Sequence, residues 1–376
     1  MPLTPKLQRR FSDDILSVFS DLTNSYKILF FLSLLRLLRI PYQGNDAPTL
    51  TLKEIGVEMV ALAWYPSKFF RLSFGMQDQM WTVIDRLKFR ILSPGKLGYF
   101  DSQMSLRSAI LEQWESINGE KLLRYVPHRF LSPFFFKELR GIKDSVKNSL
   151  IQKLSNEMFN VRQPIYKLSE DAQSLHVHPL WSHYLTSNYG VIEGWANWCW
   201  VQFLQKRNPN VPAIPEKVSP KLARGTLTWQ RDVWKKILQM KSFVCIYSNL
   251  GISPESFVLD HYAPWSFVCH DNLWNLLPVS PEANSSKNDS LPDPSYFEAF
   301  FNQQYEGLMT IKDQSVISHG LYKRVVQSYS FDLHLSASDE LFDEKRLKDA
   351  FLKTIPPLLT QAEQVGFQPG WRFMSE

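Results

Sequence analysis

The most informative stretch of this chain runs from Phe257 to Lys287 and reads FVLDHYAPWSFVCHDNLWNLLPVSPEANSSK. It opens with a β-type run that predicts a short strand ending in Asp260 and His261. Adjacent side chains of a strand point to opposite faces. One of the two can therefore hold a metal ion while the other faces a substrate.

Two amide side chains follow within the same stretch. Asn275 lies among apolar residues, where a buried amide can tie the intervening loop to itself and fix the histidine ring. Asn284 lies in a predicted helix, with Ser280 as its N-cap and Pro281 at its first position. We expect this helix to return Asn284 toward Asp260.

These residue types suit the hydrolysis of a phosphodiester bond. The carboxylate of Asp260 and the amide of Asn284 are hard ligands of the kind that Mg²⁺ or Mn²⁺ takes. His261 can activate a water, and a metal can neutralise the scissile phosphate. Lys287, one turn after Asn284, can add positive charge at the phosphate. We therefore predict catalytic roles for His261, Asn275 and Lys287, and metal binding by Asp260 and Asn284.

The stretch resembles the HNH, or ββα-metal, endonuclease family, and it is most similar to the HNH domain of CRISPR RNA-guided nucleases. The pattern consists of Asp260, His261, Pro264, Ser266, Phe267, Asp271, Asn275, Asn284, Lys287, Asp289 and Pro292. The resemblance covers about residues 243–292, so the use of a guide RNA does not carry over. It implies His261 as general base, Asp260 and Asn284 as metal ligands, and Asn275 as the residue that organises the loop.

Two features around this pattern refine the resemblance. Many family members hold a structural zinc with two Cys-x-x-Cys pairs, but here Cys245 is followed by Ser248 and no cysteine flanks Asn284. We therefore expect no zinc. The family also implies a first strand upstream, which residues 241–248 can supply.

The chain as a whole predicts an α+β fold, a mainly helical protein with a small ββα-metal nuclease module. We divide it into a helical N-terminal region at 1–220, the module at 221–310, and a helical C-terminal tail at 311–376. The segment 208–220 contains four prolines and marks the first boundary, because it cannot form one helix.

Local signals place several helices. Thr51 and Glu54 have the spacing of a capping box. Apolar periodicity predicts longer helices at 13–39, 77–89, 107–116, 135–156, 189–206 and 228–240.

The composition favours a protein of a reducing compartment, the cytoplasm. Cys199, Cys245 and Cys269 form no pairing pattern. The apolar run at 28–35 is too short to cross a membrane, for which about 20 residues are needed. It is typical of a buried helix, and we expect no membrane association.

The net charge of +5 is unevenly spread. Segment 201–241 has nine basic and two acidic residues, and segment 121–153 has eight basic and two acidic residues. We expect both to contact a nucleic-acid backbone, although solvated helix faces have a similar composition. A homodimer or a protein partner is compatible with this composition.

The leading hypothesis is an Mg²⁺-dependent HNH endonuclease. The resemblance favours DNA as its substrate and a setting such as phage defence. One alternative is a non-catalytic nucleic-acid-binding or scaffold protein with a degenerate HNH fold. The other is an RNA-cleaving nuclease of toxin type.

Overall fold

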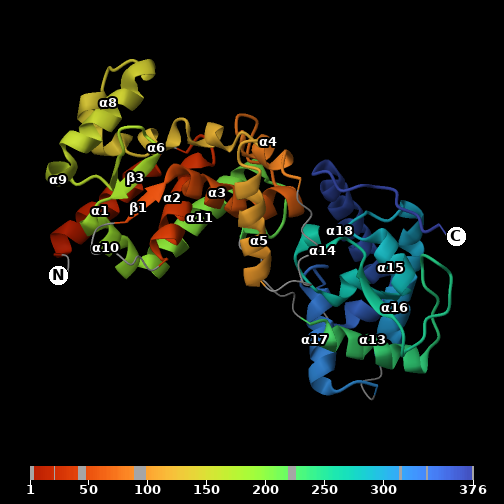
Figure 1. The fold of residues 1–376 in the computed structure, drawn as a ribbon. Helices are drawn as coiled ribbons and strands as arrows, with labels where there is room; N and C mark the ends of the chain where they lie inside the picture. The colour runs from red at the N-terminus through yellow and green to blue at the C-terminus, as the bar shows by residue number, and fades with distance from the viewer. Residues whose placement is uncertain are drawn as a thin grey trace. The chain divides into compact units, whose positions relative to one another are not determined.

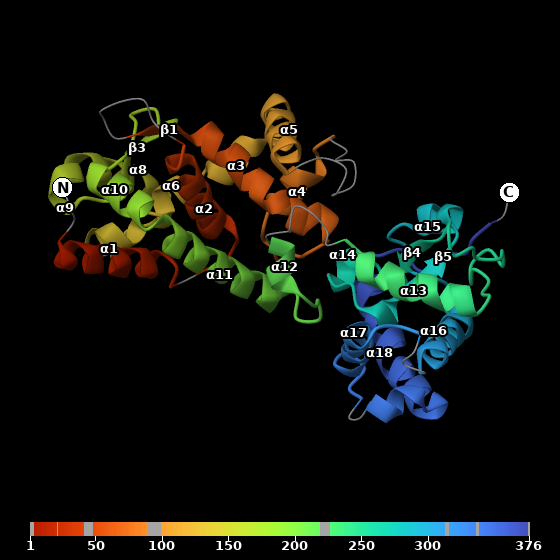
Figure 2. The ribbon, with the colours of Figure 1, turned by 90° about the horizontal axis from the view of Figure 1, so that it is seen from below.

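A computed structural model describes residues 4–20, 22–40, 48–88, 99–218, 226–312, 316–335 and 338–374. The chain forms two compact units (Figures 1 and 2). Unit 1 comprises Met1–Pro209 and Ile214–Ala223, and unit 2 comprises Asn210–Ala213 and Arg224–Glu376.

Unit 1 is mainly helical and contains one small antiparallel sheet with the strand order β1-β3-β2. Its strands are β1 (Thr49–Thr51), β2 (Tyr166–Leu168) and β3 (Ser174–Val177). Its helices are α1 (Pro5–Val18), α2 (Tyr26–Leu38), α3 (Leu52–Trp64), α4 (Met80–Asp85), α5 (Tyr99–Glu112), α6 (Val126–Arg129), α7 (Phe136–Leu139), α8 (Asp144–Glu157), α9 (Phe159–Arg162), α10 (Pro179–Ser187), α11 (Tyr189–Arg207) and α12 (Ile214–Val218).

Helix α2 lies at the centre of unit 1. Its residues 28–35 are all buried, and it packs against α3 and α11. The buried helix predicted there is present, and no described helix is long and apolar enough to span a membrane.

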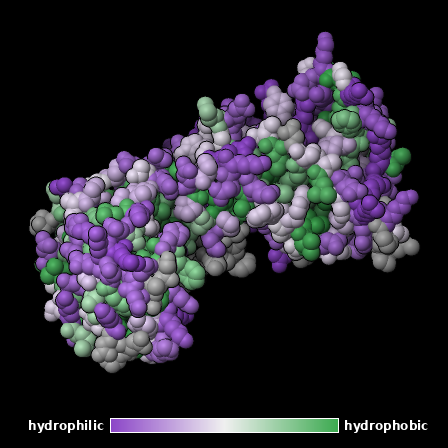
Figure 3. Space-filling model, turned by 180° about the vertical axis from the view of Figure 1, so that it is seen from behind, coloured by the Kyte–Doolittle hydropathy of each residue, from purple (hydrophilic) through white to green (hydrophobic). Residues whose placement is uncertain are grey.

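Hydrophilic side chains cover much of the face seen in Figure 3, and hydrophobic ones form smaller patches.

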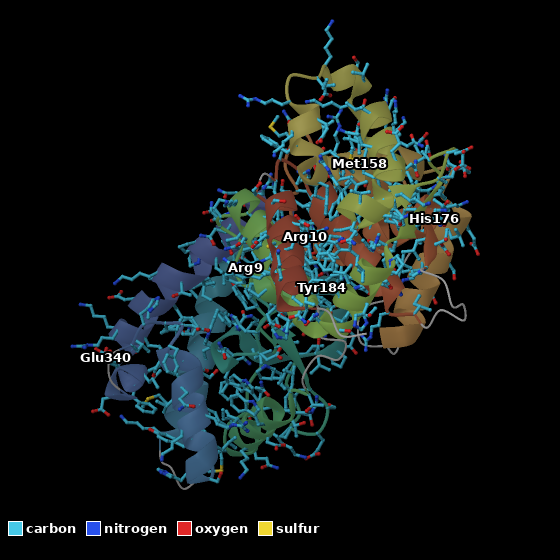
Figure 4. The ribbon with its side chains drawn as sticks, turned by 90° about the vertical axis from the view of Figure 1, so that its left-hand side faces the viewer. Arg9, Arg10, Met158, His176, Tyr184 and Glu340 are labelled. Carbon is cyan, nitrogen blue, oxygen red and sulfur yellow. The ribbon has the colours of Figure 1, made fainter. Side chains whose placement is uncertain are left out.

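The helix predicted at 13–39 is two helices, because α1 ends at Val18 and α2 begins at Tyr26. A tertiary contact holds the start of α2, where the backbone N–H of Ser25 donates to the Asp78 carboxylate at 2.7 Å. Helix α1 packs against α10 instead, where the hydroxyls of Ser12 and Tyr184 lie 2.9 Å apart. Figure 4 labels Tyr184 of α10 and Arg9 and Arg10 of α1.

The helix predicted at 135–156 is also interrupted. Helix α7 ends at Leu139, and α8 begins at Asp144. Between them Gly141 adopts a φ of +77°, a left-handed conformation that glycine accepts without steric cost. The Asp144 carboxylate accepts a 2.8 Å hydrogen bond from Arg129, which anchors the start of α8.

Other local predictions agree with the structure. The capping box is formed, since Glu54 N–H donates to Thr51 Oγ1 at 3.2 Å and Thr51 N–H donates to the Glu54 carboxylate at 2.9 Å. Helix α11 lies within one residue of its predicted bounds, and the helix predicted at 228–240 is present with those limits.

Unit 2 combines helices with one two-stranded antiparallel sheet. Its strands are β4 (Val258–His261) and β5 (Leu276–Val279). Its helices are α13 (Thr228–Met240), α14 (Trp265–Val268), α15 (Pro281–Lys287), α16 (Phe297–Ile311), α17 (His319–Ser330) and α18 (Glu344–Gln364). The predicted class, a mainly helical α+β protein, is confirmed.

One hydrophobic core runs through unit 2. It contains Trp234 of α13, Leu276 of β5 and Phe351 of α18. The Trp234 indole N–H donates to the Leu276 carbonyl at 3.0 Å. The predicted tail at 311–376 shares this core, so its described residues do not form a separate region.

The strand predicted at 241–248 differs from the structure. Among the described residues this segment has a single bridge, between Val244 and Gly251, and otherwise forms a turn. The turn is closed by the N–H of Cys245, which donates to the Leu250 carbonyl at 2.8 Å.

Candidate nuclease site

A strand pair followed by a short helix positions the predicted site. In the β4–β5 register, Asp260 lies opposite Leu277 and His261 opposite Leu276. Helix α15 then begins at the predicted N-cap, where Ser280 Oγ accepts from the N–H of Ala283 at 3.3 Å. Figure 2 shows β4, β5 and α15 together in unit 2. The fold thus brings residues 260–261 and 284–287 together.

Asp260 is a buried carboxylate, only 3% exposed. Its Oδ2 accepts a 2.9 Å hydrogen bond from the hydroxyl of Tyr247, and its Oδ1 accepts from Lys287 Nζ at 3.2 Å. Burial, together with the Asp260 carboxylate, raises the pKa of Tyr247 well above its ordinary value. The phenol therefore stays protonated and remains a hydrogen-bond donor.

Lys287 was expected beside the phosphate, but the structure places it inside the fold. Its side chain is fully buried, and Nζ donates to the His261 carbonyl at 2.7 Å as well as to Asp260. A buried ammonium group is costly unless it is paired, and this pair satisfies it. Lys287 thus offsets the charge of Asp260 from inside the fold.

His261 points to the other face of β4, and its side chain retains 11% of its exposure. Its Nε2 lies 2.9 Å from Asp271 Oδ1. An ionised carboxylate only accepts hydrogen bonds, so in the neutral imidazole this contact places the proton on Nε2 and the lone pair on Nδ1. Asp271 belongs to the residue pattern found in the sequence, but its contact with His261, ten residues away, was not predicted.

Asn275 closes the loop between β4 and β5. Its Oδ1 accepts from the N–H of Ala263 at 2.8 Å, and its Nδ2 donates to the Ala263 carbonyl at 2.9 Å. The Asn275 carbonyl also accepts from the N–H of Tyr262 at 2.8 Å. These three bonds hold the chain immediately after His261, as a loop-organising amide would.

Asn284 is half-buried on α15, one turn before Lys287 and on the same face. Its side chain makes no hydrogen bond to any residue that the structure describes, so neither Oδ1 nor Nδ2 has a partner among those residues. Asp260 and Asn284 together offer only oxygen ligands. This donor set fits a hard cation such as Mg²⁺ or Mn²⁺, which takes its remaining ligands from water and phosphate.

Residues far along the chain hold the loop that carries Asp271. The Asp332 carboxylate, just after α17, accepts from the Trp274 indole at 2.8 Å and also from the Asn272 amide. From α13, Gln230 donates to the Asp271 carbonyl at 2.9 Å. The sequence predicted no part in the site for these residues, because they are separated from it by about 30 residues or more.

Comparison with known proteins agrees with this geometry. Residues 245–293 match the family model of the HNH endonucleases. This segment is an HNH endonuclease domain. Searches of curated proteins and of solved structures found no match to the chain. The HNH domain indicates a nuclease, and nucleases of this kind bind nucleic acid and typically depend on a metal.

Several basic residues of the segment predicted at 201–241 are buried or already paired. Its residues are divided between the two units, and Lys221 and Arg224 lie outside the described residues. Lys217 is fully buried. In unit 2, Lys235 forms an ion pair with Glu255, and Lys241 forms one with Glu306. Lys206 and Lys236 of this segment are exposed and form no ion pair with any described residue.

The basic segment at 121–153 lies wholly in unit 1. Both of its acidic residues are already paired, Glu138 with Arg162 and Asp144 with Arg129. Its exposed basic residues without an ion pair to any described residue are Lys121, Arg124, Lys137, Arg140 and Lys143. This surface can therefore accept phosphate groups.

The formal net charge also differs between the two units. Unit 1 has 28 basic and 19 acidic residues, a net charge of +9. Unit 2, which contains the HNH domain, has 14 basic and 18 acidic residues, a net charge of −4. Electrostatic attraction for a polyanion is thus concentrated in unit 1.

Proposed function

We propose that this protein is a metal-dependent HNH endonuclease that hydrolyses phosphodiester bonds in DNA. The observation that carries the proposal is the arrangement on β4. His261 has one ring nitrogen tied to Asp271, while the adjacent Asp260 presents a buried carboxylate on the opposite face. A base and a metal ligand are thus held side by side on a rigid strand pair.

His261 acts as the general base. Because Nε2 donates to Asp271, Nδ1 is free to take a proton from an attacking water. The negative charge of Asp271 then stabilises the imidazolium that forms. Asn275 fixes the backbone after His261 and so limits the movement of the ring.

Asp260 and Asn284 would hold one Mg²⁺ or Mn²⁺ ion. Such an ion, when bound, neutralises charge on the scissile phosphate and on the leaving oxygen. Lys287 acts as a positioning residue, since it contacts Asp260 and the His261 carbonyl from within the fold. It offsets the cost of burying the Asp260 carboxylate.

Unit 1 supplies most of the affinity for nucleic acid, through segment 121–153. This follows from its net charge of +9 and its exposed, unpaired basic residues. DNA is favoured over RNA because the residue pattern resembles DNA-cutting HNH members. The three cysteines are free, and we expect the enzyme to act in the cytoplasm, for example in defence against phage.

The first experiment compares wild type, His261→Ala and His270→Ala on supercoiled plasmid, with Mg²⁺, with Mn²⁺ and with EDTA. We expect metal-dependent nicking that falls about 10²- to 10⁴-fold in His261→Ala, because a general base contributes an effect of that size. His270 is the matched control, since it lies on the same loop and no role is assigned to it.

Other outcomes identify the alternatives. Cleavage of an RNA control but not of plasmid indicates an RNA nuclease of toxin type. Binding without cleavage of either substrate, unchanged in His261→Ala, indicates a degenerate scaffold. A single HNH site cuts one strand, so a linear product indicates a homodimer or two successive nicks.

A further inference from the structure

The turn at residues 245–250, just before β4, directs the side chain of Tyr247 into the interior of unit 2. Asn249 N–H donates to the Cys245 carbonyl at 2.9 Å, and Asn249 has a left-handed φ of +57°. Tyr247, at the centre of this turn, is 5% exposed. The turn thus fixes where the hydroxyl of Tyr247 lies relative to Asp260.

Two other aromatic rings surround Tyr247. Tyr296 and Trp371 each lie with ring centroids 5.0 Å from it, at interplanar angles of 89° and 84°. Edge-to-face packing of this kind is favourable and directional. Trp371 belongs to the segment that follows α18, more than a hundred residues from Tyr247 in sequence.

The segment that carries Trp371 is tied to the residues just after the HNH helix α15. The N–H of Leu291 donates to the Gln368 carbonyl at 2.8 Å, and Trp371 N–H donates to the Leu291 carbonyl at 2.9 Å. Asp293 N–H donates to the Trp371 carbonyl at 2.9 Å, and Arg372 forms a 3.0 Å ion pair with Asp293. Residues 368–373, which we call the clasp, are thus bonded to residues 291–293 and place Trp371 against the ring of Tyr247.

We propose that Tyr247 is a positioning residue for the metal ligand Asp260, and that the clasp at 368–373 is part of the metal site because it holds Tyr247 in place. The inference rests on the proposed function. Tyr247 and Lys287 each donate to a different oxygen of Asp260. This fixes the plane of the carboxylate and leaves each oxygen a lone pair for a cation. Without Tyr247, the carboxylate can rotate about its bond to Lys287.

Unit 2 provides a matched control for this hydroxyl. Tyr262 is also fully buried, and its ring stacks on Phe300 at 3.9 Å. Its hydroxyl, however, has no hydrogen-bond partner among the described residues. Tyr262→Phe therefore removes the same atom as Tyr247→Phe without removing a hydrogen bond.

The test measures Mn²⁺ binding directly, by the electron paramagnetic resonance signal of free Mn²⁺. The protein is the full chain carrying His261→Ala, with a duplex oligonucleotide present, so that no cleavage occurs. We expect Tyr247→Phe to raise the dissociation constant of Mn²⁺ about tenfold, because it removes a hydrogen bond to a charged group. Tyr262→Phe is expected to leave this constant unchanged.

The clasp is tested by Trp371→Leu in the same background. We expect a rise in the dissociation constant of Mn²⁺ in the same direction, with the thermal unfolding midpoint recorded alongside it. Trp371→Phe, which keeps an aromatic ring against Tyr247, is expected to restore most of the affinity. A purely structural role would lower the unfolding midpoint without changing Mn²⁺ affinity in the protein that remains folded.

The outcomes separate this inference from the proposed function. If wild type binds Mn²⁺ and nicks plasmid but Tyr247→Phe binds Mn²⁺ equally well, the positioning role is wrong and the nuclease stands. If wild type neither binds Mn²⁺ nor cleaves, both proposals fail together.

Discussion

Each unit of this protein buries one carboxylate to the same extent, and the two are satisfied in different ways. Glu58 on α3 and Asp260 on β4 are both 3% exposed. Glu58 accepts two hydrogen bonds from the guanidinium of Arg107, at 2.5 and 2.8 Å, and one from Arg36 at 3.2 Å. Asp260 has one ammonium and one neutral hydroxyl as partners.

This difference shows that burial alone does not mark a functional carboxylate. Burial raises the pKa of Glu58, but hydrogen bonds and charge from Arg107 and then Arg36 outweigh it, so the pKa is lowered. Both oxygens of Glu58 accept hydrogen bonds from guanidinium groups, so Glu58, Arg36 and Arg107 form a structural ion cluster. Asp260 has fewer donors, and Asn284 lies on α15 one turn before its partner Lys287, so Asp260 keeps room for a ligand.

The largest expected effect tests the structural side of this comparison. Glu58→Gln should lower the free energy of unfolding by about 3 kcal/mol, because two guanidinium groups lose their buried partner. We place it at the lower end of the range since both arginines retain some solvent contact. Urea denaturation measures it, with the exposed Glu115→Gln as control. Equal stability of the two variants would contradict a structural role.

The pH dependence of stability follows from the same group. Because the folded pKa of Glu58 is lowered, its stabilisation is complete above the unfolded value of about 4.3 and is lost as the pH falls through the folded pKa. The stability difference between wild type and Glu58→Gln should therefore shrink as the pH is lowered below about 4. A difference that is constant between pH 6 and pH 3 would show that this linkage is absent.

The functional side is tested by Asp260→Asn. We expect plasmid nicking to fall by at least about a hundredfold, because a metal ligand loses its charge and even supporting residues of metal sites have effects of about 10- to 100-fold. Glu282→Gln, an exposed change on α15, is the control. Nicking at the wild-type rate in Asp260→Asn would remove Asp260 from the metal site.

A smaller effect is expected at the partner of His261. Asp271→Asn should reduce nicking about tenfold, because an amide can still orient the ring but does not stabilise the imidazolium. The rate measured against pH should change in shape, whereas loss of fold would lower it uniformly. The control is Asp349→Asn, an exposed change on α18 that leaves the contact between His261 and Asp271 intact. An unchanged pH profile in Asp271→Asn would exclude a catalytic role for the pair formed by His261 and Asp271.

The smallest effect concerns the charge difference between the units. Reversing two exposed residues of unit 1, with Arg140→Glu and Lys143→Glu, should weaken DNA binding and reduce its salt dependence by about one counterion per lost phosphate contact. Lys353→Glu in unit 2 is the control. Fluorescence anisotropy at several salt concentrations measures both. A larger loss in the control would place DNA binding on unit 2.

The sequence is informative wherever the physical cause is local. The Thr51–Glu54 capping box and the Ser280-Pro281 start of α15 each depend on contacts within one helical turn. The bounds of the helix at 228–240 follow from apolar periodicity alone. The HNH pattern is also local, because its spacings along one strand pair and one helix encode its geometry.

The helix predictions that differ from the structure fail for tertiary reasons. The start of α2 is held by a bond between Ser25 and Asp78, more than 50 residues away. The interruption near Gly141 coincides with the Arg129 contact that anchors α8. Apolar periodicity describes which face a helix buries, but it does not contain the distant partner that ends it.

The sequence by itself determined which residues carry the nuclease pattern, and it predicted the strand that ends in Asp260 and His261 and the helix that carries Asn284 and Lys287. Only the tertiary structure decided how they are supported: Asp271 turns to His261, Lys287 points inward to Asp260, and Tyr247 is clasped by residues 368–373. The physical reason is that a buried charge must find its partners in space. Those partners come from segments that pack together only when the whole of unit 2 has folded.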